Sequence, residues 1–139
     1  MQEWSIVEQL PSAADYNRLR DLVGWGTYRE DVIVKSLPNS LYCVCATADG
    51  RVVGMARVIG DGGMVYYVQD VIVVPGYQRR GIGTQLMDRV MAYICTHASH
   101  NSIVGLMAAK GKEAFYTRYG FTVRPTDQLG SGMTMFWKA

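Results

Sequence analysis

The chain has 139 residues, of which 49% are hydrophobic and 19% are charged, and this balance suits one small domain built around one core. The formal net charge of +2 is too mild to indicate nucleic acid binding, for which a concentrated basic face is expected. No segment has the ~18 apolar residues that span a bilayer and no export signal opens the chain, so we predict a single cytoplasmic domain over 1–139 without membrane partners.

The first part of the chain predicts strands and helices in alternation. The Pro11-Ser12 pair opens a helix, and Leu19, Leu22 and Val23 supply its apolar face. The Asp49-Gly50 pair is a strong signal for a hairpin between two strands. The expected elements here are a strand over 4–8, the helix after residue 12, a helix over 28–37, and strands over 41–48 and 52–59.

The second part begins with a nearly continuous apolar strand over 65–74, which is typical of a strand with helices on both faces. Apolar residues then recur every fourth position and predict a helix with a wide apolar face. That face consists of Ile82, Leu86, Val90 and Ile94 together with Met87 and Met91. The remaining expected elements are a strand over 102–107, a helix over 111–119 ended by Gly120, and a final pair of strands over 121–123 and 133–137.

Between the long apolar strand and the helix lies the segment 78–83, with the sequence QRRGIG. The first amides of a helix have no intrahelical partner and carry partial positive charge, so a pyrophosphate fits there. Glycine lets a ligand approach the backbone, and Arg79 and Arg80 can add charge-assisted bonds to phosphate oxygens. We interpret 78–83 as an anion-binding turn, and the plain alternative is a turn that only starts a helix.

Two other phosphate-binding loops do not fit this segment. A dinucleotide fingerprint needs a third glycine where this chain has Leu86, and a mononucleotide loop needs a Gly-Lys-Ser/Thr run that the chain lacks. A nucleotide-binding protein of another kind stays open as an alternative, and it predicts that nucleoside triphosphates bind to this turn.

A second motif, AFYTRYGF, covers 114–121. Together with the Q/R-x-x-G-x-G/A pattern after the apolar strand, it resembles the GNAT N-acetyltransferase superfamily. The resemblance covers the whole chain and implies an α/β GNAT acyl-CoA N-acyltransferase fold, with a mixed, mostly antiparallel central sheet flanked by helices. It also implies acetyl-CoA as co-substrate and no metal. The residues that match the family's cofactor contacts are Val71, Ile72 and Val73 on the strand, and Gln78, Arg79, Arg80, Gly81, Ile82, Gly83 and Thr84 in the turn.

The same resemblance implies a catalytic role for Tyr116, whose counterpart in the family protonates the departing thiolate. A phenol with an ordinary pKa of about 10 stays protonated at neutral pH and can donate to that thiolate. Phe115 and Tyr119 are four residues apart and form a helical stripe suited to packing, whereas Tyr116 points elsewhere. The alternative is an aromatic ring that only packs. The chain departs from the family at Ala109, where an asparagine is common, so the start of this helix is expected to differ.

Asp70 lies beside Gln69 inside the apolar strand, where an unpaired carboxylate would be costly. Burial raises the pKa of a carboxylate and makes it a better base, so Asp70 is a candidate to deprotonate the attacking amine. The alternative is a structural carboxylate that caps backbone donors or pairs with an arginine such as Arg57.

The acceptor is expected to be an amine of a small molecule or peptide, bound by loops at the acyl end. Trp25 and Tyr28 could stack on such a ligand or attract its cation, and Asp127 could bind a cationic amine. Core packing of the two aromatic residues and solvation of Asp127 are the alternatives. A different functional class also stays open, namely a non-catalytic acyl-CoA-binding regulatory module. A homodimer is expected from the resemblance alone.

The cysteines and histidines indicate no metal site. Cys43 and Cys45 share one face of a predicted strand and are interpreted as small buried apolar residues. Cys95, His97 and His100 lie at a helix end without a matching partner pair elsewhere, and the histidines suit the exposed carbonyls there.

Overall fold

The structure, a computed structural model, describes residues 3–139, and the chain divides into two compact units, Met1–Gly105 and Leu106–Ala139. The prediction of a single domain over 1–139 stays a prediction. No helix among the described residues is long and apolar enough to cross a membrane.

The first unit is built on a five-stranded sheet with the order β1-β2-β3-β4-β5. Neighbouring strands are antiparallel except for β4 and β5, which are parallel. The sheet is therefore mixed and mostly antiparallel, as predicted. The strands are β1 (Ser5–Glu8), β2 (Tyr42–Ala48), β3 (Arg51–Gly60), β4 (Val65–Val73) and β5 (Ile103–Gly105).

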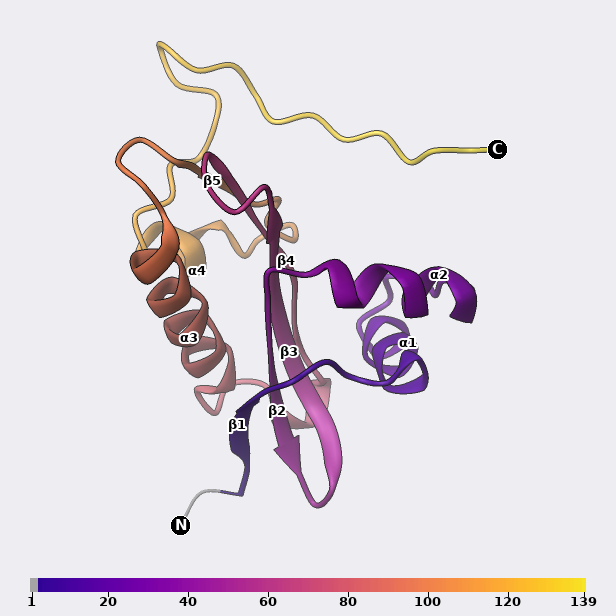
Figure 1. The fold of residues 1–139 in the computed structure, drawn as a ribbon. Coiled ribbons are helices and arrows are strands. Elements are labelled where there is room, and N and C mark those ends of the chain that lie inside the picture. Colours follow the sequence, from indigo (N-terminus) through magenta and orange to yellow (C-terminus); the bar gives the residue numbers. More distant parts are fainter. Residues whose placement is uncertain (1–2) are drawn as a thin grey trace. The chain divides into compact units, whose positions relative to one another are not determined.

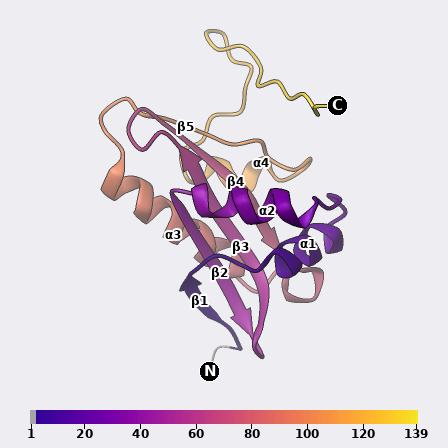
Figure 2. The ribbon, with the colours of Figure 1, turned by 45° about the vertical axis from the view of Figure 1, so that its right-hand side comes forward.

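Helices cover both faces of this sheet, with α3 on one side and α1 and α2 on the other (Figures 1 and 2). The helices of the first unit are α1 (Ala13–Leu22), α2 (Glu30–Ser36) and α3 (Ile82–His97), with short 3-10 turns η1 (Leu37–Asn39) and η2 (Pro75–Tyr77). Because both faces are covered, alternate residues of β4 are buried and the others are mostly half-buried. This agrees with the apolar character of its sequence.

Local sequence signals explain several of these boundaries. The Ser12 hydroxyl accepts the Asp15 amide N–H at 3.1 Å and caps α1. Asp49 and Gly50 both have positive φ angles, 50° and 73°, which a tight hairpin turn requires. Gly54 lets α3 pack close, because an added Cβ there would lie 3.0 Å from the Ile72 carbonyl oxygen and 3.3 Å from the Leu86 side chain.

The core of the first unit lies between α3 and the sheet, with a smaller part under α1 and α2. Of the predicted face of α3, Met91 is only half-buried. On α1, Leu19 is buried as expected, but Leu22 is 49% exposed, so its assignment to the apolar face is wrong. The buried face of α3 consists of Ile82, Leu86, Met87, Val90 and Ile94.

The second unit contains one short helix, α4 (Glu113–Thr117), and no strand among its residues 106–139. The predicted strands over 121–123 and 133–137 are therefore wrong. Residues such as Phe136 and Trp137 favour strands, but a strand also needs a hydrogen-bonded neighbour, and neither segment has one. Phe136 and Trp137 are 81% and 82% exposed.

Candidate functional site

The turn between β4 and α3 exposes an uncapped helix N-terminus. Gly81 precedes α3 with a φ of 94°, and no side chain caps the helix. The first intrahelical bond runs from the Gln85 amide to the Gly81 carbonyl oxygen at 3.1 Å, so the amides before Gln85 precede the helical ladder. Residues 78–81 are all exposed. These features give the turn the anion-binding geometry that its sequence predicts.

Two side chains of the turn contact their surroundings. The Gln78 side-chain amide donates to the Val73 carbonyl oxygen at 2.8 Å and so ties the turn to the end of β4. Arg80 pairs with Glu3 at 2.5 Å and lies 5.2 Å from the centre of the Tyr77 ring. Both members of the Arg80 pair are largely exposed, so a stronger anion can displace Glu3 at little cost.

The strand before the turn has an open edge. Its parallel pairing with β5 covers only the first three residues of β4, up to Tyr67. No strand among the described residues pairs with 68–73 on that side. On the other side, Asp70 and Val71 of β4 lie opposite the single residue Ala56 of β3, which is a β-bulge. No described strand therefore competes with an extended ligand for this edge of the Val71–Val73 stretch, where the Val73 carbonyl oxygen already accepts from Gln78.

Asp70 sits in this bulge with a φ of 57°, and its side chain is fully buried. Four donors surround its carboxylate. The Tyr16 hydroxyl and Arg57 Nε each donate to Oδ2 at 2.7 Å, and Arg20 Nη1 and the Gln69 side-chain amide each donate to Oδ1 at 3.3 Å. The structure therefore contains the ion pair between Asp70 and Arg57 that is the alternative to a general base role for Asp70.

These contacts bear on the two roles considered for Asp70. A carboxylate with four donors has its lone pairs occupied, so accepting a further proton requires the loss of a partner. Burial and the neighbouring Asp70 charge raise the pKa of Tyr16 to about 12, so its hydroxyl keeps its proton. Burial alone would lower the pKa of Arg57, but the hydrogen bond and charge of Asp70 outweigh it and raise that pKa. The geometry favours the ion pair over the general base.

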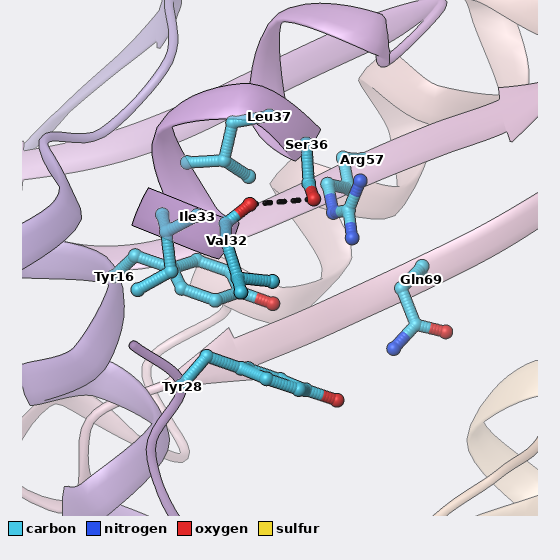
Figure 3. A pocket seen from close by; sticks show the side chains of 8 residues that line it. All are labelled: Tyr16, Tyr28, Val32, Ile33, Ser36, Leu37, Arg57 and Gln69. Atoms are coloured by element: carbon cyan, nitrogen blue, oxygen red, sulfur yellow. Dashed lines mark hydrogen bonds between the residues drawn. The ribbon is translucent and has the colours of Figure 1, made fainter. Parts of the chain in front are cut away.

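A cavity of about 210 Å³ lies beside this network (Figure 3). Arg57 and Gln69 enter it from β3 and β4, and Figure 3 shows the arginine side chain pointing toward the space between Tyr28 and Gln69. The remaining wall comes from α1, α2 and their connection, and consists of Tyr16, Val32, Ile33, Ser36 and Leu37.

The predicted substrate residues Trp25 and Tyr28 lie in the connection between α1 and α2. Tyr28 lines the cavity, whereas Trp25 is not among the lining residues. The Arg20 guanidinium lies 4.8 Å from the Tyr28 ring centre and 5.8 Å from that of Trp25. An internal cation therefore already occupies the aromatic faces that the sequence suggested for a substrate amine. Arg20 also forms an ion pair with Asp70, at 3.3 Å.

Tyr16 and Arg20 are functional candidates that the sequence did not reveal. They are four residues apart and so lie on the same face of α1. A polar and a charged residue on the face that also carries Leu19 could have signalled a buried partner. That partner, Asp70, lies 54 residues after Tyr16 and 50 residues after Arg20 along the chain.

The predicted acid Tyr116 and the loop residue Asp127 belong to the second unit. Tyr116 lies in α4, with its ring edge-on to Phe115 at 5.0 Å and to Phe121 at 6.3 Å. Burial raises the pKa of Tyr116 above its usual value of 10, which preserves the protonated phenol. Asp127 is exposed. The two roles stay predictions.

Three comparisons relate the chain to known proteins. A family model described as acetyltransferase (GNAT) domain matches residues 26–136. The chain is 31% identical to SA2161 from meticillin-resistant Staphylococcus aureus, a protein of unknown function and probable acetyltransferase, with a TM-score of 0.89 over 96% of this chain and 99% of that one. The GNAT family protein SP0256 from Streptococcus pneumoniae is 28% identical, with a TM-score of 0.76 over 98% of each chain.

Curated relatives match at similar identity. Histone acetyltransferase TAP1 of Glycine max is 30% identical over 88% of this chain, and serotonin N-acetyltransferase 2, chloroplastic, of Oryza sativa is 31% identical over 74% of it. The chain spans only about half the length of these relatives, 55% and 52% respectively.

Proposed function

We propose that this chain, which belongs to the GNAT acetyltransferase family, transfers the acetyl group of acetyl-CoA directly to a primary amine of a small molecule or peptide. The observation that carries the proposal is the uncapped N-terminus of α3, which lies behind the exposed turn 78–81 and follows the open edge of β4 along the chain. A pyrophosphate fits the first feature and an extended amide-containing arm fits the second.

The residues present fit acetyl-CoA, which supplies an activated thioester when bound. The amides at the start of α3 bind phosphate oxygens, and Arg79 and Arg80 add charge. Gly81 holds the turn in a left-handed conformation that other residues adopt only with strain. The backbone of Val71–Val73 on the open edge binds the extended arm and orients the acyl end.

We assign the thiolate proton to Tyr116, whose pKa is raised by burial. An oriented amide of the β4 bulge stabilises the charge that develops on the acyl oxygen. Holding amine and thioester together supplies much of the catalysis, because well-oriented reactants can gain about 7–11 kcal/mol. The amine proton goes to solvent or to a base other than the fully bonded Asp70.

The acceptors named for the histone and serotonin acetyltransferases belong to those proteins and do not fix the acceptor of this chain. A cytoplasmic location also stays a prediction, and two of the relatives are named chloroplastic.

A thiol-release assay tests the proposal. The purified chain is incubated with acetyl-CoA and a panel of amines, and free CoA is followed with a thiol reagent. We expect release that requires both the chain and an amine. Saturable acetyl-CoA binding without release for any amine would instead indicate the regulatory binding module and would refute the transferase.

A further inference from the structure

The cavity beside Asp70 carries an excess of positive charge. Arg57 and Arg20 contribute two cations and Asp70 one anion, which leaves a net charge of +1 in the buried network. Both arginine side chains are only 12% exposed, so solvent screens them weakly. Among the eight described residues that line the cavity, Arg57 alone carries a formal charge.

Arg57 is held in place before any ligand arrives. Its Nε donates to Asp70 at 2.7 Å and its Nη1 donates to the Ser40 hydroxyl at 3.2 Å. These two bonds fix the plane of the guanidinium, and Figure 3 shows its end pointing toward the space between Tyr28 and Gln69. A preorganised arginine binds a carboxylate without a further loss of side-chain entropy.

Gln69 lies on the same wall and is uncharged. Its amide nitrogen donates to Asp70 at 3.3 Å, and Figure 3 shows its amide oxygen pointing away from the other lining residues. A ligand with an anionic group therefore finds a cation in Arg57 and no competing anion among the residues that line the cavity. A purely cationic amine finds Arg57 repulsive, and Arg20 already occupies the aromatic faces of Trp25 and Tyr28.

The size of the cavity limits the ligand. A cavity of ~150 Å³ holds benzene, so about 210 Å³ holds on the order of eight non-hydrogen atoms. One carboxylate balances the net charge of +1, whereas a doubly charged phosphate would exceed it. Resting on the proposed function, we infer that the acceptor is a small amine that carries a carboxylate, that is, an amino acid, whose carboxylate binds Arg57. Asp70 acts as a positioning residue for that arginine.

Matched acceptors test this inference in the thiol-release assay. Each amino acid is paired with the amine that lacks its carboxylate: β-alanine with ethylamine, and 4-aminobutyrate with propylamine. O-phosphoethanolamine and a lysine-containing peptide complete the panel. We expect at least one amino acid to exceed its partner amine by about 10- to 100-fold in kcat/KM, mainly through KM, as a charged hydrogen bond predicts.

Arg57→Gln should bring the kcat/KM of the amino acid down to that of its partner amine, and Arg57→Lys should retain part of the difference between them. Arg29→Gln is the matched control, because Arg29 is 81% exposed and pairs with Asp31 outside the cavity. Urea unfolding of each variant shows whether it folds. If Arg57→Gln does not, calorimetric titration of the wild type with each acceptor pair in the presence of CoA gives the same comparison.

The outcomes separate this inference from the proposed function. Turnover that is equal within each pair, or fastest with the amine-only members, the phosphorylated amine or the lysine peptide, overturns the amino acid acceptor and leaves the transferase standing. Absence of turnover with every acceptor refutes the transferase. In that case, calorimetric binding of amino acids that Arg57→Gln abolishes still supports the carboxylate site, and absence of such binding overturns it.

Discussion

Replacing Asp70 by Asn removes the only anion that contacts Arg57 and Arg20 in the described structure. The carboxylate is fully buried and both arginines are 12% exposed, so little solvent enters to replace the lost charge. Removing one partner of a buried pair costs about 3–5 kcal/mol. Asparagine keeps one acceptor oxygen for part of the donor set, so we expect a loss near the lower end, about 3 kcal/mol.

Equilibrium unfolding in urea, followed by tryptophan fluorescence, measures this loss. A domain of this size is typically stable by about 5–15 kcal/mol, so the variant should still fold and give a measurable transition. Asp31→Asn is the matched control, because the Arg29–Asp31 pair spans 2.6 Å but is mostly exposed. Its loss should stay below about 1 kcal/mol.

A loss for Asp70→Asn that equals the control would refute the ion-pair assignment. A variant with unchanged stability and abolished turnover would restore the general base role predicted from the sequence.

Three further changes test other parts of the account. Tyr16→Phe should flatten the alkaline loss of stability. The folded pKa of Tyr16, about 12, lies above the unfolded value of 10, so the wild type has this contribution, about 2.7 kcal/mol, below pH 10 and loses it toward pH 12. Parallel curves of stability against pH for the two proteins, from urea unfolding at pH 9 to 11.5, would contradict this. Gly81→Ala should lose about 1 kcal/mol of stability, because the φ of Gly81 is 94°. Its control, Gly76→Ala, should lose none, because Gly76 has no positive φ and has open space for a Cβ. Equal unfolding midpoints for the two variants would show that the turn is not strained. Tyr116→Phe should lower kcat by about 10²-fold or more and leave acetyl-CoA affinity within a few-fold, and an unchanged kcat would remove its acid role.

Local signals predicted much of the fold of the first unit. Three signals depend only on residues that are close together in the sequence, namely the Asp49-Gly50 turn, the apolar run of β4 and the four-residue spacing along α3. Each of these elements lies within a few residues of its expected place. The turn after β4 was predictable for the same reason, because glycines and arginines adjoin the helix start. The absence of the final pair of strands was not predictable, because a strand needs a hydrogen-bonded neighbour and the sequence of a segment does not identify that neighbour.

The Asp70 network shows the same limit at the candidate site. The sequence indicated that a carboxylate in an apolar strand needs a partner, and Arg57 was one of the partners considered. Tyr16 and Arg20 join it only because α1 packs against β3 and β4. For the same reason the sequence does not show that Arg20 lies against the rings of Trp25 and Tyr28, whose contact with the acceptor stays a prediction.

Binding of acetyl-CoA by the turn and the β4 edge is tested by a calorimetric titration of the purified chain with acetyl-CoA, run beside ATP under the same conditions. We expect saturable binding of acetyl-CoA at a single site and at least tenfold weaker binding of ATP, because the open edge of β4 contributes only to the acyl-bearing ligand. No binding of acetyl-CoA, or equal affinity for ATP, would contradict it.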